Sequence, residues 1–323
     1  MGNHSPPMKI HVMAGVLQDD QGRVLVTRRP DHVHQGGLWE FPGGKLDPDE
    51  TPEQGLAREL DEELGIRVTG SRPLIRIHHH YGDRHILLDV RRIDAYSGRP
   101  SGREGQPLDW LHPEVLDPSQ FPAADRPIIM ALRLPQQMLI TGPDPRDPEV
   151  HLERLQLALG PGIGPNIGLV QLRAHELDDR AYRDLAARAY SLCTAAGARL
   201  LLNRDPAVIK DTPRHGLHLS ARQLKELKRR PGLPGELVGA SCHDAAELTQ
   251  AVALGLDFAL LSPVKATASH PSARSLGWSG FAALVDPIPL PVYALGGLTP
   301  ADLAEATHHG AQGIAAIRGL WPG

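Results

Sequence analysis

The chain has 323 residues, of which 41% are hydrophobic and 22% are charged, and its formal net charge is −4. This is the composition of an ordinary folded protein, and the length suits two domains better than one. A mildly acidic chain has no general attraction to nucleic acids or anionic membranes, which argues against stable binding to either. We find neither a secretory signal nor a run of the roughly 20 apolar residues that would span a membrane, so we expect a cytoplasmic protein.

The first 134 residues predict a mixed α+β domain. The chain is expected to begin with a strand at residues 10–17 and a second strand at 23–29 that forms a hairpin with it. A Gly- and Pro-rich loop at 35–44 and a helix at 52–64 follow. Two further paired strands at 74–80 and 85–93 and a short helix at 123–134 complete the domain.

Residues 135–323 follow a different pattern, in which short apolar segments alternate with amphipathic helical segments. Eight strand candidates recur at intervals typical of βα units: residues 138–142, 169–173, 199–203, 216–220, 237–241, 258–263, 292–297 and 313–317. This alternation indicates a parallel sheet with helical crossovers. Eight units favour closure into a compact (β/α)8 TIM barrel, with a doubly wound open sheet as the alternative.

An acidic helix in the first domain carries the chemistry. Thr51 can cap its N-terminus, Pro52 suits its first position, and Gln54 completes a capping box. Gly65 stands where a helix ends in a left-handed glycine. The sequence therefore predicts a short, well-delimited helix between these signals.

Three glutamates of this helix share a face. At about 100° per residue, Glu59, Glu62 and Glu63 lie close together beside a stripe of three leucines. Like charges at this spacing cost roughly a few tenths of a kcal/mol each, which a bound cation would offset. Carboxylate oxygens are the ligands that Mg²⁺ prefers, with Mn²⁺ as the alternative cation. Arg58 can reach Glu62 one turn further on and hold it in place.

The 23-residue pattern from Gly44 to Ile66 resembles the Nudix box in full. The similarity covers roughly residues 8–134 and points to the MutT-type branch, which hydrolyses oxidised nucleotides such as 8-oxo-dGTP to the monophosphate and pyrophosphate. The other segments that carry it are Leu25–Arg29, Leu38–Lys45, Asp83–His85, Gly102–Pro107 with Trp110, and Phe121–Pro127.

This resemblance implies a role for each matching residue. Water attacks a phosphorus atom while cations take up the developing charge. The implied catalytic residues are Glu50, Arg58, Glu59, Glu62, Glu63 and Glu104. The implied cation ligands are the Gly43 carbonyl oxygen and the carboxylates of Glu59, Glu62, Glu63 and Glu104. The implied contacts to a small-molecule nucleotide are Arg29, Glu40, Phe41 and Asp125.

One departure concerns purine recognition. Asp125 stands where MutT-type proteins carry an Asn that reads the modified base. An ionised carboxylate can accept hydrogen bonds, but it can donate one to a purine oxygen only when it is protonated. Base selectivity therefore depends on the protonation of Asp125.

The second domain resembles thiamine phosphate synthase and its relative, the thiazole tautomerase. The resemblance rests on Val170–Arg173, Leu202–Asn203, Gly216–Leu219, Gly239–His243, Leu261–Val264 and Tyr293–Gly297. The candidate site residues that it implies are Gln171, Arg173, Asn203, Ser241, His243, Gly296 and Gly297. The two glycines follow the seventh strand, where such barrels bind phosphate.

Several positions depart from the synthase pattern. His175 and His270 stand in place of lysines, and Arg204 stands in place of an aspartate. Residues 220–223 replace an acidic stretch. A guanidinium in place of a carboxylate opposes the binding of Mg²⁺-pyrophosphate, so we expect a barrel of degenerate synthase type.

Three functional hypotheses follow. The first is an Mg²⁺-dependent 8-oxo-dGTP pyrophosphohydrolase whose barrel stabilises or dimerises it. The second is a bifunctional thiamine-pathway enzyme that combines a diphosphate hydrolase with a synthase, or with a tautomerase that uses His243. The third is a non-catalytic ligand-binding regulator, against which the intact acidic helix argues.

Overall fold

The computed structural model describes residues 8–33, 35–81, 84–142, 146–160, 167–267 and 274–322. The chain divides into two compact units, one of residues 1–133 with 286–289 and the other of residues 134–285 with 290–323. Among the described residues, every helix is too short or too polar to cross a membrane.

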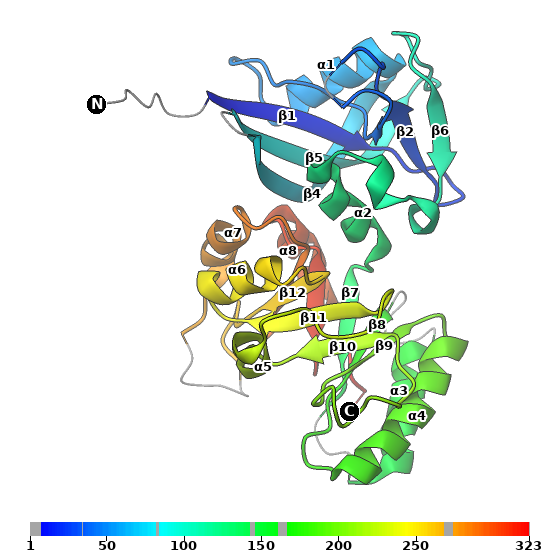
Figure 1. The fold of residues 1–323 in the computed structure, drawn as a ribbon, viewed down its shortest axis with the longest axis vertical. Helices are drawn as coiled ribbons and strands as arrows, with labels where there is room; N and C mark the ends of the chain where they lie inside the picture. The colour runs from blue at the N-terminus through cyan, green and yellow to red at the C-terminus, as the bar shows by residue number, and fades with distance from the viewer. Residues whose placement is uncertain are drawn as a thin grey trace. The chain divides into compact units, whose positions relative to one another are not determined.

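The first unit contains two three-stranded sheets (Figure 1). One has the order β1-β5-β4, in which β5 runs parallel to β1 and antiparallel to β4; the other is antiparallel with the order β3-β2-β6. The strands are β1 (Met8–Val16), β2 (Val24–Arg28), β3 (Trp39–Glu40), β4 (Arg67–Tyr81), β5 (Arg84–Ser97) and β6 (Leu108–Leu111). The helices are α1 (Pro52–Leu64) and α2 (Arg126–Arg133), and 3-10 turns cover Pro113–Val115, Pro118–Gln120 and Ala123–Asp125.

The pairing of the first two strands differs from the prediction. The turn between them is as expected, because Gln18 bridges to Val24 and the Leu25 N–H donates to the Leu17 carbonyl at 3.0 Å. Beyond it the strands separate: β1 pairs with β5, and β2 pairs with β3 and β6. The predicted hairpin is therefore confirmed next to its turn and wrong beyond it, because alternating apolar residues determine which side chains face the core but not which strand supplies the backbone partner.

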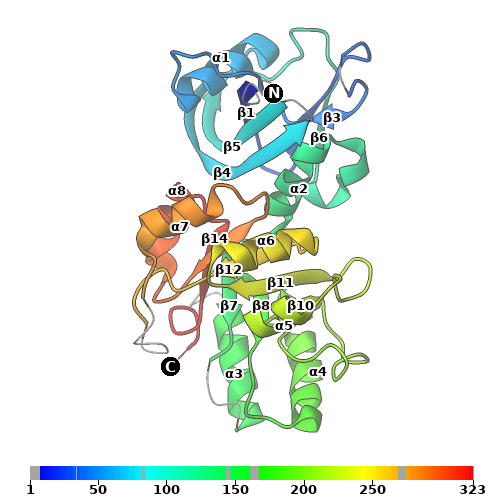
Figure 2. The ribbon, with the colours of Figure 1, turned by 60° about the vertical axis from the view of Figure 1, so that its left-hand side comes forward.

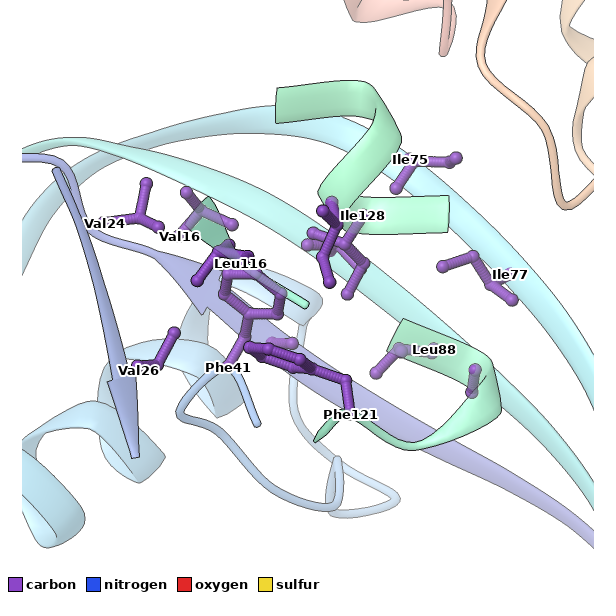
Figure 3. Close-up of a cluster of buried hydrophobic side chains, with 14 residues drawn as sticks. Val16, Val24, Val26, Phe41, Ile75, Ile77, Leu88, Leu116, Phe121 and Ile128 are labelled. Atoms are coloured by element: carbon purple, nitrogen blue, oxygen red, sulfur yellow. The ribbon is translucent and has the colours of Figure 1, made fainter. Parts of the chain in front are cut away.

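Two hydrophobic clusters use opposite faces of β1. Met13 packs with α1, β2 and β5 residues in one cluster, whereas its neighbour Ala14 belongs to the cluster that contains α2. Figure 3 shows the second cluster, in which the rings of Phe41 and Phe121 stack with centroids 5.8 Å apart. The alternation of side chains along β1 thus attaches the acidic helix to one face and the C-terminal helix of the unit to the other.

The second unit is a closed barrel of eight parallel strands in the order β10-β11-β12-β13-β14-β7-β8-β9 (Figure 2). The strands are β7 (Gln137–Ile140), β8 (Ile167–Leu172), β9 (Arg199–Leu202), β10 (Gly216–Leu219), β11 (Leu237–Cys242), β12 (Phe258–Leu261), β13 (Val292–Leu295) and β14 (Gly313–Ala316). All eight fall on predicted segments, and pairing of β14 with β7 closes the barrel. The predicted (β/α)8 fold is confirmed, and the open sheet is excluded.

Short connections explain how so few residues complete a barrel. The helices are α3 (Pro148–Leu159), α4 (Asp179–Ala195), α5 (Ala221–Glu226), α6 (Ala245–Ala253), α7 (Gly277–Val285) and α8 (Leu303–His308). Residues 203–215, all of which the structure describes, connect β9 to β10 through turns and no helix. Within the described part of the barrel, α5 and α8 have only six residues each.

Candidate active site

Helix α1 begins and ends where its sequence signals place it. The Thr51 hydroxyl accepts the Gln54 N–H at 3.3 Å, and the Gln54 side chain accepts the Thr51 N–H at 2.9 Å. Gly65 ends the helix with a φ of 71°, in the left-handed region that favours glycine. Buried Leu56, Leu60 and Leu64 attach the helix to the core, which leaves the glutamates on its other side.

Arg58 joins three of the predicted catalytic carboxylates. Its Nε and Nη2 donate to the two Glu50 carboxylate oxygens at 2.7 and 2.9 Å. Its Nη1 donates to Glu59 at 2.9 Å and to Glu62 at 3.3 Å. The bond to Glu62 is the contact that the sequence predicts one helical turn further on. The Lys45 carbonyl accepts a further bond from Nη2 at 3.1 Å. These charge-assisted bonds fix Arg58 and hold the carboxylates near the loop before the helix.

Glu63, near the C-terminal end of α1, contacts the backbone of the loop before the helix. The Gly43 N–H donates to the Glu63 carboxylate at 3.0 Å. Burial, together with the nearby carboxylates of Glu40, Glu104 and Glu59, raises the pKa of Glu63 to about 8, against the opposing effect of the Gly43 bond. The carboxylates of Glu40, Glu59 and Glu104 therefore lie within electrostatic reach of Glu63 and disfavour its negative charge.

Two glycines allow this close approach. A Cβ on Gly43 would lie 2.2 Å from the Met13 carbonyl oxygen, and the φ of Gly43 is 145°. A Cβ on Gly44 would lie 2.2 Å from Glu59 Oε2. The loop can lie between β1 and the glutamates only because it has no side chains at these two positions.

The donor set fits a divalent cation. All the candidate ligands are carboxylate or carbonyl oxygens, which Mg²⁺ prefers, and burial with the neighbouring carboxylates raises the pKa of Glu63, so a cation bound there would stabilise its charged form. In the described residues, no three His, Cys, Asp or Glu side chains converge tightly enough to form a complete metal cage. Mg²⁺ needs no such cage, because it uses one or two carboxylates together with waters and substrate phosphates.

The predicted substrate contacts lie beside this cluster. Arg29 forms an ion pair with Glu40, and both side chains are partly buried. Asp125 is 9% exposed and accepts a hydrogen bond from the Phe41 N–H. Burial, followed by the Glu40 carboxylate, raises the pKa of Asp125 to about 7 despite the Phe41 bond and Arg29. The Phe41 ring is buried in the core, so this residue reaches Asp125 through its main chain rather than its ring.

The barrel holds a second group of polar residues. His218 is fully buried on β10, and its Nε2 lies 2.9 Å from Ser241 Oγ on β11. Gln171 and Asn203 are also buried, and Asn203 Nδ2 donates to the His218 carbonyl at 2.7 Å. The Gln171 Oε1 and His218 Nδ1 atoms have no partner among the described residues. His218 was not among the predicted site residues, although a histidine within the apolar segment Gly216–Leu219 was the available signal.

The remaining barrel candidates make contacts of their own. His243 Nδ1 lies 3.0 Å from Glu247, which also accepts from Lys225 at 2.7 Å. The Arg173 N–H donates to the Thr141 hydroxyl at 2.9 Å. Gly296 and Gly297 have φ values of 108° and 67°, and added Cβ atoms would meet residues 263–266 at 2.7–3.2 Å. Packing against that segment is therefore one reason for glycine at these positions.

Arg204 occupies a position between two loops of the barrel. Its guanidinium donates to the Ala174 carbonyl at 3.4 Å and to the Leu177 carbonyl, and it lies 4.8 Å from the Tyr182 ring centroid. The positive charge is thus held in place by the loop that carries His175. His270 lies outside the described residues.

Comparisons with known proteins agree with the two units. A sequence profile described as a NUDIX domain matches residues 13–131, and one described as thiamine monophosphate synthase matches residues 137–320. The 8-oxo-dGTP diphosphatase of Escherichia coli (strain K12) is 35% identical over 125 residues, which cover 39% of this chain and 97% of the relative. The CTP pyrophosphohydrolase of the same organism is 39% identical over 127 residues, with coverages of 38% and 93%.

The barrel has its own relatives. The thiamine-phosphate synthase of Thermosynechococcus vestitus (strain NIES-2133 / IAM M-273 / BP-1) is 30% identical over 183 residues, which cover 56% of this chain and 50% of that protein. The chain therefore belongs both to the Nudix family, as a Nudix hydrolase through its first unit, and to the thiamine monophosphate synthase family through its barrel.

Proposed function

We propose that the first unit is an Mg²⁺-dependent pyrophosphohydrolase of MutT type, which converts 8-oxo-dGTP to 8-oxo-dGMP and pyrophosphate. The observation that carries this proposal is the group of carboxylates around Gly43 and Arg58, in which burial and neighbouring glutamates raise the pKa of Glu63 to about 8. Such a group is stabilised by a divalent cation, and Mn²⁺ would also suit its oxygen ligands.

The residues of this chain would divide the work. Glu59, Glu62, Glu63 and Glu104, with the Gly43 carbonyl, would hold the cation, which supplies compensation for negative charge on the phosphates. Arg58 keeps Glu50, Glu59 and Glu62 in place through its hydrogen bonds. Arg29, released from Glu40, would bind a phosphate group of the nucleotide.

Base selectivity is assigned to Asp125. The relatives include enzymes named for 8-oxo-dGTP and for CTP at similar identity, so overall similarity does not separate the two substrates. A protonated Asp125 would donate to the purine O6 oxygen, and its pKa of about 7 allows this form near neutral pH. Preference for 8-oxo-dGTP over CTP, which has an amino group in place of O6, is therefore expected to be greatest below that pH.

A substrate panel tests the proposal. The full chain with Mg²⁺ is assayed against 8-oxo-dGTP, dGTP, CTP and thiamine diphosphate, and kcat/KM is compared for each substrate. Glu59→Gln should abolish hydrolysis while the thermal unfolding temperature stays the same. Glu53→Gln is the matched control, since Glu53 lies on the same helix, is exposed and pairs with Arg91 rather than with Arg58. Full activity of the Glu59 variant, or a preference for thiamine diphosphate, would refute the assignment.

We infer that the barrel is a degenerate synthase that has kept a small-molecule site. Arg204 brings positive charge to a position where a carboxylate would be needed for Mg²⁺-pyrophosphate. The unpartnered Gln171 Oε1 and His218 Nδ1 atoms favour a bound ligand, because buried polar atoms nearly always have partners. Assay of the full chain with hydroxymethylpyrimidine diphosphate and thiazole phosphate distinguishes the two outcomes: binding without turnover supports a degenerate barrel, and turnover above background excludes it.

A further inference from the structure

The loop that follows β5 holds the C-terminal end of α1. The Ser101 N–H donates to the Leu64 carbonyl at 3.0 Å, and the Arg103 N–H donates to the Glu63 carbonyl at 2.9 Å. Arg103 Nη1 also donates to the Asp61 carbonyl at 3.1 Å. The last carbonyls of a helix have no partner within the helix, so these bonds attach the loop to the helix end.

Gln106 adds a link that differs from the others. Its Nε2 donates to the Glu63 carbonyl at 3.1 Å, and its Oε1 accepts the Glu104 N–H at 2.9 Å. One partly buried side chain thereby joins the main chains of two residues that carry candidate cation ligands. A primary amide is suited to this, because it has both a donor and an acceptor.

The two residues that Gln106 joins repel each other. The carboxylate of Glu104 raises the pKa of Glu63 and also that of Glu40, so it lies within electrostatic reach of both. Repulsion alone would move the Glu104 loop away from the helix. The turn from Gly102 to Gln106 is tight, since a Cβ on Gly102 would lie 2.2 Å from the Gln106 carbonyl oxygen. This close approach of the two ends of the turn opposes the movement of Glu104.

We propose that Gln106 is a positioning residue, whose side-chain amide fixes Glu104 relative to Glu63 so that both carboxylates are presented to one divalent cation. The inference rests on the proposed function, to which the cation and the role of Glu104 belong. Gln106 itself touches neither substrate nor cation. Its effect is transmitted through two main-chain hydrogen bonds.

Two substitutions in the full chain test this role. Gln106→Ala removes the side chain, and Gln106→Met keeps its length but removes donor and acceptor. Gln54→Ala is the control, because this glutamine caps the opposite end of the same helix and lies away from the Glu104 loop. For each variant we would measure Mn²⁺ affinity without nucleotide by electron paramagnetic resonance, kcat and KM for 8-oxo-dGTP, and the thermal unfolding temperature.

Loss of positioning predicts a specific pattern. Both Gln106 variants should bind Mn²⁺ about 10- to 100-fold more weakly and lose kcat by a similar factor, with little change in KM for the nucleotide. Gln54→Ala should lower the unfolding temperature and leave Mn²⁺ affinity unchanged. If Gln106→Ala does not fold, Gln106→Met decides the question, since it preserves the side-chain length.

Failure of this inference is distinguishable from failure of the proposed function. If Glu59→Gln is inactive but the Gln106 variants bind Mn²⁺ as the parent does, Gln106 has no positioning role and the hydrolase assignment stands. If Glu59→Gln retains full activity, the assignment itself is wrong. A Gln106→Met variant that loses thermal stability to the same extent as Gln54→Ala, with unchanged Mn²⁺ affinity, would show a purely structural role.

Discussion

The Asp125→Asn substitution gives the sharpest test of the nucleotide site. Asp125 is 9% exposed, lies at the end of a 3-10 turn and accepts the Phe41 N–H. An asparagine has nearly the same shape and can keep that hydrogen bond through its Oδ1 atom. It does not titrate, however, so comparison with the parent isolates the protonation of Asp125.

The size of the effect follows from the shift in pKa. Burial, with the Glu40 carboxylate, raises the pKa of Asp125 from 3.8 to about 7, so folding favours the protonated form. The resulting contribution to stability is complete below the unfolded pKa and is lost as the pH rises through the folded pKa. With about 1.4 kcal/mol for each pH unit, the parent should lose roughly 2 kcal/mol relative to Asp125→Asn between about pH 5.5 and about pH 8.5.

Differential scanning calorimetry of both proteins at these two pH values measures the difference. The transition of the first unit should shift with pH in the parent relative to the variant, while the barrel transition should respond equally in both. The same pair of proteins tests selectivity. The parent should lose preference for 8-oxo-dGTP over CTP, which has no O6 oxygen, by about tenfold between about pH 6 and about pH 8, as the protonated fraction falls, and the variant should not.

A stability difference that stays constant across this range would refute the reasoning. It would mean that Asp125 is already ionised at the lower pH and that its carboxylate only accepts hydrogen bonds. Selectivity would then have to come from another residue of the pocket.

Three further substitutions have separate readouts. Arg58→Ala should lower kcat by about 10- to 100-fold, because the guanidinium no longer holds Glu59 in place; a kcat equal to that of the parent would contradict this. Gly44→Ala should lower kcat to a similar degree, because the new Cβ would lie 2.2 Å from Glu59 Oε2, and unaltered Mn²⁺ affinity would argue against displacement of that carboxylate. Gly239→Ala should destabilise the barrel by about 1–3 kcal/mol, because its Cβ would lie 2.2 Å from the Phe258 ring, and unchanged hydrolase kinetics would show that the units act separately.

The sequence was sufficient wherever the determining interactions are local. The ends of α1 follow from Thr51, Gln54 and Gly65, whose contacts span only a few residues. The same holds for the bond from Arg58 to Glu62, which lies one turn away. The eight barrel strands were also predictable, since strands buried on both faces read as short apolar runs.

Other features depend on contacts between distant segments. β1 pairs with β5 although β2 is closer in sequence, and no local pattern identifies that partner. Gln106 reaches a carbonyl 43 residues away, so its role is visible only in the folded chain. His218 stood in a predicted strand, but its contact with Ser241 depends on the register between β10 and β11.

The pairing of β14 with β7 has a consequence for synthesis of the protein. The strand that completes the ring, Gly313–Ala316, leaves the ribosome more than a hundred residues after its partner Gln137–Ile140. Until then β7 has an unpaired edge, which can attract other chains, whereas the sheet of β1, β4 and β5 is already complete by residue 97. Nascent chains stalled within the barrel would therefore aggregate through β7 while already carrying a folded β1-β5-β4 sheet.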